Sequence, residues 1–249
     1  MLKIEREKEV LQVLMEHGDV SVHELSKALY TSESTIRRIL ASLEKKGLAR
    51  RTYGGAELSQ TVGHAPIFRD RTKEHTAAKQ EIARKAAALV PDGSIVFLDQ
   101  SSSAYFLANE LRKKKQLTVV TNNLEIAGLL ARTELQVYVS GGRLSREMRM
   151  CLVGEDAQKI FLEINADFAF FSARSLSEDG TISDCDRDEV CVRSAMLRNA
   201  KCRVFLCDSS KYSTSSGYRQ CSLSDLNVLI SEGKTAMRFA KTGKKLKVM

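Results

Sequence analysis

Apolar runs rich in β-branched residues alternate with helical patterns between residues 79 and 230. The strand-like runs are Ser94 to Leu98, Leu117 to Val120, Leu135 to Val139, Ala166 to Phe171, Cys202 to Leu206 and Val228 to Ile230. Helical patterns lie between most of them, and another, from Lys79 to Leu89, precedes the first. This alternation favours a parallel sheet, because parallel strands need a crossover that is long enough to hold a helix. The sequence therefore predicts an α/β domain, with helices on both faces of a mostly parallel sheet.

Polar or glycine-rich segments directly follow four of these strands, beginning at Asp99, Thr121, Gly141 and Asp208. Ligands bind at the carboxyl ends of strands in open α/β sheets, and hydroxyls ahead of a helix suit an anion. Each segment alone is more typical of a turn or helix cap than of a binding site, but their recurrence at one topological position favours a site for a phosphorylated sugar or polyol. The candidate effector-binding residues are Asp99, Ser101, Ser102, Ser103, Thr121, Asn122, Asn123, Gly141, Gly142, Arg143 and Lys211.

The first 57 residues show three short helical patterns followed by a strand-like stretch. Ser21 to Glu24 has the form of a capping box, which marks the start of the second helix. In the third helix, four apolar residues recur at helical spacing: Ile36, Ile39, Leu40 and Leu43. Three short helices joined by tight turns are typical of a helix-turn-helix unit. The basic stretch from Arg50 to Gly55, which ends in Gly-Gly, has the pattern expected of a wing.

The opposite face of the third helix has the chemistry that a DNA groove requires. Between Ser34 and Gly55 there are six basic residues and one acidic residue. Arginines bridge phosphates or recognise guanine bidentately, and short hydroxyls contact either bases or backbone. We assign Ser34, Thr35 and Arg38 to the groove and Arg37, Arg50, Arg51 and Tyr53 to the DNA backbone. The alternative is a solvated helix face with an incidental arginine pair.

Composition excludes several other classes of protein. The six cysteines form no CxxC pair and all four histidines precede residue 76, so we expect no metal and no cofactor. No apolar stretch reaches 18 residues, which argues against a membrane span. The N-terminus lacks the apolar core of a secretory signal, so a cytoplasmic location is expected. The net charge of +8 is compatible with a nucleic-acid partner.

Two sets of motifs resemble the DeoR family of transcriptional regulators over nearly the whole chain. In the head they are Ser32 to Leu40 and Tyr53 to Ala56; in the second domain they are Asp99 to Ser103, Leu117 to Asn123, Gly141 to Arg143, Gly154 and Asp208 to Tyr212. The resemblance implies a winged helix-turn-helix head and a sugar-phosphate sensor with a fold similar to that of ribose-5-phosphate isomerases and CoA transferases.

The chain departs from the family pattern at several positions. Tyr30 and Ser101 stand where the family usually has glycine, and Ile39 stands where it usually has aspartate. Ser172-Ala173-Arg174-Ser175 replaces a glycine-rich stretch, so Arg174 joins the candidate effector-binding residues as a cation for a second anionic group.

These observations predict a DNA-binding transcriptional regulator, in the first instance a repressor, that responds to a phosphorylated sugar and is not an enzyme. The expected domains are the winged helix-turn-helix (1–57), a linker (58–75), the α/β sensor (76–233) and a basic tail (234–249). The expected partners are double-stranded operator DNA, a phosphorylated sugar effector and a second copy or three further copies of the chain, with no membrane. Two alternatives stay open. One is a sugar-phosphate isomerase with Asp99 or Glu189 as base and Lys211 as electrostatic partner; the other is a constitutive DNA-binding protein whose sensor has lost its ligand.

Overall fold

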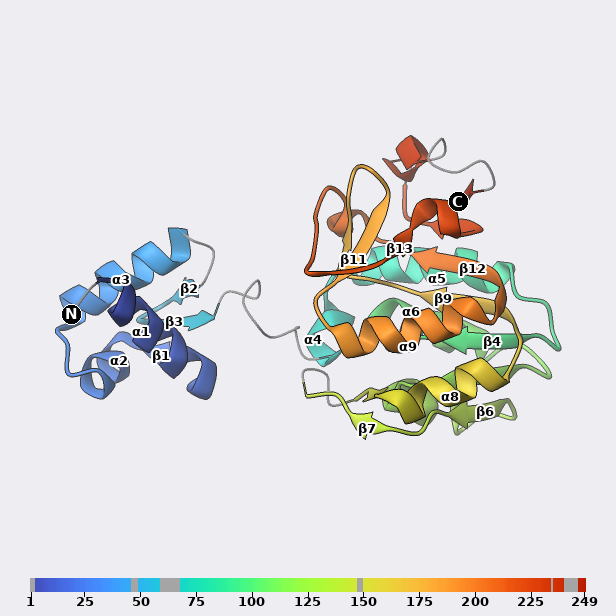
Figure 1. Cartoon of the computed structure of the whole chain (residues 1–249), viewed down its shortest axis with the longest axis horizontal. Coiled ribbons are helices and arrows are strands. Elements are labelled where there is room, and N and C mark those ends of the chain that lie inside the picture. The colour runs from blue at the N-terminus through green and yellow to red at the C-terminus, as the bar shows by residue number, and fades with distance from the viewer. Residues whose placement is uncertain (1–2, 46–48, 59–67, 147–149, 234, 240–245) are drawn as a thin grey trace. The chain divides into compact units, whose positions relative to one another are not determined.

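The computed structural model describes residues 3–45, 49–58, 68–146, 150–233, 235–239 and 246–249 (Figure 1). The chain forms two compact units, Met1–Pro66 and Ile67–Met249, which we call the head and the sensor unit. Within the described ranges, no helix is both long enough and apolar enough to cross a membrane.

The head consists of three helices and a small antiparallel sheet. Its elements are α1 (Lys3–His17), β1 (Val20–Ser21), α2 (Val22–Ala28), α3 (Glu33–Lys45), β2 (Ala49–Thr52) and β3 (Gly55–Leu58), with the strands in the order β1-β3-β2. The predicted capping box is present: the Glu24 backbone N–H donates to Ser21 Oγ (3.1 Å) and the Ser21 N–H donates to Glu24 Oε2 (2.9 Å). The predicted winged helix-turn-helix is confirmed.

The head's core lies between the apolar faces of its helices. Ile36, Ile39, Leu40 and Leu43 of α3 are all buried, together with Val10 and Leu14 of α1 and Leu25 of α2. Gly55 is required where β1 meets β3, because a Cβ at that position would lie 2.5 Å from the carbonyl oxygen of Val20. The Gly-Gly pair of the wing thus permits a close backbone approach as well as a turn.

The sensor unit is built on a seven-stranded sheet in the order β15-β14-β12-β9-β4-β5-β6, and every neighbouring pair is parallel. Its strands are β4 (Ile95–Leu98), β5 (Thr118–Thr121), β6 (Gln136–Val139), β9 (Ala166–Phe171), β12 (Ala200–Leu206), β14 (Val228–Ile230) and β15 (Lys247–Val248). The described helices are α4 (Phe68–Lys73), α5 (Thr76–Ala88), α6 (Ser102–Leu111), α7 (Leu124–Leu130), α8 (Glu155–Glu163) and α9 (Arg187–Arg198). The α/β fold predicted from the sequence is confirmed.

Smaller elements surround this sheet. They are β7 (Arg143–Leu144) paired with β8 (Leu152–Val153), a sheet of β10 (Ser175–Leu176), β11 (Thr181–Asp184) and β13 (Tyr218–Ser222), and 3-10 turns at Ser209–Lys211, Leu223–Asp225 and Thr235–Phe239.

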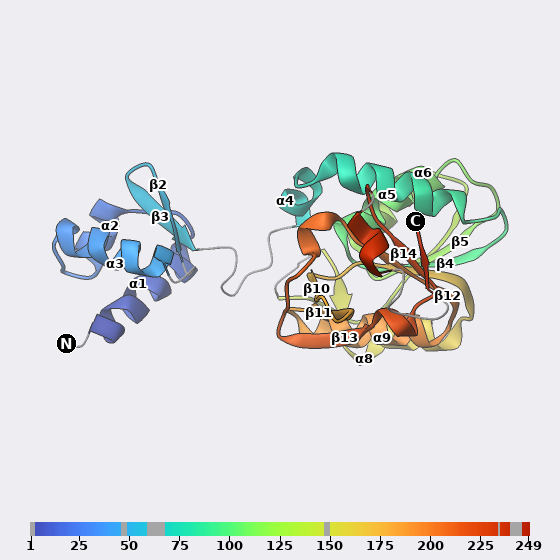
Figure 2. The same ribbon diagram turned by 90° about the horizontal axis from the view of Figure 1, so that it is seen from above.

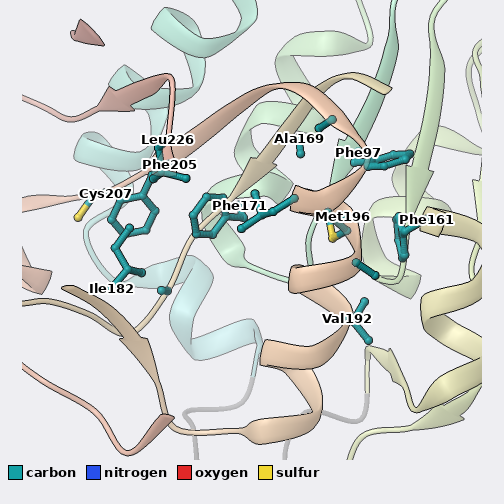
Figure 3. Close-up of a cluster of buried hydrophobic side chains, with 14 of the residues drawn as sticks. Phe97, Phe161, Ala169, Phe171, Ile182, Val192, Met196, Phe205, Cys207 and Leu226 are labelled. Carbon is teal, nitrogen blue, oxygen red and sulfur yellow. The ribbon is translucent and has the colours of Figure 1, made fainter. Parts of the chain in front are cut away.

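Helices cover both faces of the large sheet (Figure 2). Successive residues of a strand point to opposite faces, so Val96 and Leu98 pack in the cluster that contains α5, α6 and α7, whereas Phe97 packs with α8 and α9. Figure 3 shows Phe97, Phe161 and Met196 together in the second of these layers. This two-sided burial explains why the strands are continuous apolar runs in the sequence.

Two expected segment boundaries differ from the structure. Residues 68–73 of the expected linker form α4, because Phe68 is buried in the sensor core and meets the ring of Tyr105 edge-on. The expected basic tail contributes β15, which pairs with β14, because Leu246 and Val248 alternate with lysines and pack against the sensor core. Residues 59–67, 234 and 240–245 of these two segments lie outside the described residues.

Candidate functional site

The exposed face of α3 carries the predicted DNA-contacting residues. Ser34, Arg37 and Arg38 are exposed, and Thr35 is half-buried. The hydroxyls of Ser34 and Thr35 lie 3.1 and 2.9 Å from Ser32 Oγ, at the start of the helix. These short side chains are therefore ordered around the N-terminal turn of α3, the part of a recognition helix that contacts base edges.

Carboxylates already pair with two of the four arginines. Arg37 lies 3.0 Å from Glu33, one turn away on α3, and Arg50 of β2 lies 2.5 Å from Glu57 of β3. Sequence reasoning missed both acidic partners, although Glu33 is spaced four residues from Arg37 as helical ion pairs require. Among the described residues, Arg38 has no ion-pair partner.

The wing presents one more arginine and a tyrosine. The backbone N–H of Arg51 donates to Glu44 (3.1 Å), while its side chain is exposed and, within the described part of the chain, has no ion-pair partner. Tyr53 is fully exposed in the turn between β2 and β3. Arg38, Arg51 and Tyr53 are thus the assigned side chains that are most available for a partner.

In the sensor unit, the parallel sheet places the predicted polar segments at one edge. Asp99 follows β4, Thr121 ends β5, Gly141 and Gly142 follow β6, and Asp208 follows β12. Ser172 follows β9 at the same edge. Three hydrogen bonds join the segments after β4, β5, β9 and β12: the Ser172 N–H donates to Asp99 Oδ2 (3.1 Å), Asn123 Nδ2 donates to the Gln100 carbonyl (3.1 Å), and Lys211 Nζ donates to Ser172 Oγ. Residues from four strand ends therefore share one polar cluster.

Several candidate residues have structural roles in this cluster, as helix caps or at a close approach of two backbone segments. Ser101 caps α6, because its hydroxyl accepts from the Ala104 N–H and donates to Asp99 Oδ1. Asn123 caps α7 through the amides of Glu125 and Ile126. Gly142 has a φ of 102°, and a Cβ there would lie 2.5 Å from the Val153 carbonyl oxygen. Ser101, Asn123 and Gly142 therefore shape the loops, whatever else they bind.

The remaining candidate residues differ in burial and in whether their side chains already have a partner. Thr121 is buried and its hydroxyl accepts from the Asn123 N–H (3.1 Å). Arg143 is exposed but forms an ion pair with Asp188 of α9. Arg174 is half-buried after β9. Lys211 pairs with Asp208, with 3.4 Å between Nζ and Oδ2.

Three buried oxygens at this edge lack a hydrogen-bond partner among the described residues. One is Asp208 Oδ2, which forms an ion pair with Lys211 (3.4 Å); the other two are Ser103 Oγ in the first turn of α6 and Asn122 Oδ1 after β5. Ser103 and Asn122 are 1% and 0% exposed. A buried polar atom without a partner costs free energy, and such atoms mark places where a ligand or water completes the network. Ser103 and Asn122 therefore provide the clearest polar anchors for a ligand.

A buried guanidinium, missed by sequence reasoning, organises the base of the cluster. Arg193 of α9 is 2% exposed and lies 3.1 Å from Asp99, 3.0 Å from Asp184 and 3.5 Å from Glu189. The only sequence signal was a charged residue beside the apolar Val192, Ala195 and Met196 of α9. Both carboxylate oxygens of Asp99 accept from protein donors, so Asp99 is a structural anchor rather than an available base.

Burial is the main cause of the raised pKa values in this cluster. Burial raises the pKa of Asp99, and Arg193 offsets only part of that effect. Burial and the neighbouring Asp184 raise the pKa of Glu189 to about 7, against the opposing effects of Arg193, Arg71 and the hydrogen bond from Gln100 (2.8 Å). Glu189 therefore changes its protonation state near neutral pH, beside the candidate effector-binding residues. No group of three metal-ligating side chains occurs in the residues that the structure describes.

Comparison with known proteins agrees with this architecture. Residues 6–62 match the family described as the DeoR-like helix-turn-helix domain, and residues 74–233 match the DeoR C terminal sensor domain. Over 233 residues the chain is 34% identical to the uncharacterized HTH-type transcriptional regulator YgbI of Escherichia coli K12, covering 93% of this chain and 91% of the relative. It is 28% identical to the glycerol-3-phosphate regulon repressor of the same organism, covering 93% and 92%.

Among solved structures, ribose 5-phosphate isomerase A from Neisseria gonorrhoeae is similar to this chain with a TM-score of 0.41 and 18% sequence identity. The similarity covers 55% of this chain and 53% of the isomerase.

Proposed function

Because the chain belongs to the DeoR family of transcriptional regulators, with a DNA-binding head and a small-molecule sensor, we propose that it is a repressor in the cytoplasm that responds to a phosphorylated sugar or polyol. The relatives that match over more than 90% of its length are named as transcriptional regulators rather than enzymes. The observation that most directly supports this proposal is the pair of unpartnered buried oxygens of Ser103 and Asn122 at the strand edge.

The head would place α3 in the major groove of double-stranded operator DNA. Arg38 is then the side chain best placed to recognise a base, because it is exposed and, within the described residues, has no carboxylate to release first. Ser34 and Thr35 would approach base edges from the same turn, while Arg50, Arg51 and Tyr53 would contact the DNA backbone. A homodimer or homotetramer would present such heads to half-sites about 34–36 Å apart.

Replacing Arg38 with alanine is expected to weaken binding to the DNA upstream of the chain's own gene by about 1–3 kcal/mol, because one bidentate base contact is lost. Affinity for a random duplex should change much less. Gel-shift titration of both duplexes at one fixed salt concentration measures the two effects. Equal losses on the two duplexes would instead place Arg38 on phosphate, and no loss on either would remove it from the interface.

At the sensor edge, the available groups match a phosphorylated polyol. Lys211 supplies positive charge, and the first turn of α6 leaves backbone N–H groups open to an anion. Asn122 Oδ1 can accept from a sugar hydroxyl, while Ser103 Oγ can donate or accept. Arg174 adds a second cation after β9. These groups would bind both the phosphate and the hydroxyls of one small ligand.

The effector is tested by calorimetric titration of the full chain with glycerol 3-phosphate and ribose 5-phosphate, each beside its unphosphorylated parent. We expect binding of a phosphorylated compound only, weakened about tenfold or more in Lys211→Met because a charge-assisted contact is lost. Lys201→Met is the matched control. Lys201 is an exposed lysine that forms an ion pair with Asp167, and it lies at the end of β12 opposite the candidate site. Failure of every phosphorylated compound in a broad panel to bind would favour the constitutive DNA-binding alternative.

A further inference from the structure

Tyr30, in the turn between α2 and α3, combines backbone strain with complete exposure. Its φ is 47°, in the left-handed region that side-chain-bearing residues adopt at a cost. Its side chain is 96% exposed, so the ring gains almost nothing from packing in the head. The exposed Tyr30 ring therefore adds little to the stability of the isolated head, while its backbone conformation lowers that stability.

The surrounding structure fixes this conformation. The Thr31 N–H donates to the Ser26 carbonyl (3.0 Å), and Ser26 Oγ donates to the Thr31 carbonyl (2.6 Å). Arg6 of α1 donates to the Leu29 carbonyl (3.1 Å) on the other side of the turn. The backbone on both sides of Tyr30 is therefore held, which fixes the direction of its Cα–Cβ bond before any partner arrives.

The location of the turn points to the kind of partner. In a helix-turn-helix, the first helix crosses the DNA backbone and the N-terminal residues of the second contact base edges. A residue between these two helices lies over the phosphates at the edge of the groove. A phenol hydroxyl donates a hydrogen bond, and a phosphate oxygen accepts one.

We infer that Tyr30 is a DNA-positioning residue whose hydroxyl donates to a backbone phosphate beside the groove that α3 enters. This inference rests on the proposed function, because it requires that the head bind DNA. It adds an uncharged contact to the cationic ones assigned above. The strained turn lowers the stability of the free head, and the contact that its phenol makes raises the affinity of the head for DNA.

The test uses Tyr30→Phe, which removes one oxygen, and Tyr30→Gly, which removes the ring and relieves the strain. Tyr218→Phe is the matched control, because Tyr218 is an exposed tyrosine of the sensor unit that the proposed interface does not use. Binding of the full chain to a 30-base-pair random duplex is measured by fluorescence anisotropy over a series of salt concentrations.

Tyr30→Phe is expected to bind about tenfold more weakly, because a hydrogen bond to a charged acceptor is lost. Its dependence of log affinity on log salt should keep the native slope, since a neutral side chain displaces no counterion. Arg51→Ala should lower the magnitude of that slope by about one, which calibrates the comparison.

Tyr30→Gly separates a contact from a structural role. We expect amide hydrogen exchange in α2 and α3 to slow by about fivefold as the strain is relieved, while affinity for the duplex falls at least as far as in Tyr30→Phe. Native affinity in Tyr30→Phe would overturn the inference and leave the proposed function intact. Failure of the native chain to bind any duplex would overturn both.

Discussion

Replacing Arg193 with methionine is expected to lower the free energy of unfolding of the sensor unit by about 3–5 kcal/mol. The guanidinium is 2% exposed and is the cation shared by Asp99, Asp184 and Glu189. Methionine keeps the apolar stem but not the guanidinium, so the loss comes mainly from the carboxylates that remain. Each must then stay charged in an apolar environment or take up a proton, and either course costs free energy.

Urea unfolding of the full chain at pH 7 measures this change. Arg198→Met is the matched control, because Arg198 lies exposed in the last turn of the same helix and should alter the free energy of unfolding by less than about 0.5 kcal/mol. Adding Asp184→Asn to Arg193→Met should recover part of the loss, since one of the uncompensated carboxylates disappears. A loss in Arg193→Met no larger than that in Arg198→Met would show that the guanidinium is not the group that stabilises this cluster.

Helices and strands could be predicted from the sequence better than the ion pairs and hydrogen bonds between side chains. The strands of the large sheet could be located because their burial on both faces leaves continuous apolar runs, as in Ile95–Leu98 and Val204–Leu206. β15 could not, because Lys247 in the chain's last strand makes that stretch read as a basic tail. Short edge strands bury too few residues to give a clear periodic signal.

The site was predictable where topology alone decides position. Residues after parallel strands meet at one edge, so Asp99 and Asp208 could be placed together without any structure. Arg193 could not be placed, because its role depends on carboxylates 94, 9 and 4 residues away that meet it only in the folded chain. The pairing of Arg50 with Glu57 was hidden for a similar reason, since it requires the cross-strand register of β2 and β3.

Replacing Glu189 with glutamine is expected to remove a pH dependence of stability between about pH 4.5 and pH 7. The carboxyl is 3% exposed, and burial, followed by the charge of Asp184, raises its pKa to about 7 from its ordinary value of 4.5. In that window the folded state holds a proton that the unfolded state has released. The free energy of unfolding of the native chain must therefore fall as pH rises through the window, by about 3 kcal/mol in all if Glu189 acts alone.

Glutamine resembles the protonated acid, and its amide oxygen can still accept from Gln100 and Arg193. The variant should match the native chain near pH 4.5 and exceed its free energy of unfolding by about 2–3 kcal/mol at pH 8. Burial also raises the pKa of Asp99, which adds a slope of the same sign in both proteins, so the difference between them isolates Glu189.

Urea unfolding at four pH values between 4.5 and 8 measures this difference. Glu163→Gln, an exposed change at the end of α8, should follow the native curve throughout. Parallel curves for Glu189→Gln and the native chain would mean that Glu189 is ionised across the whole range. Divergence that grows between about pH 4.5 and pH 7 would instead mean that Glu189 keeps its proton in the folded chain across that range, beside the candidate effector-binding residues.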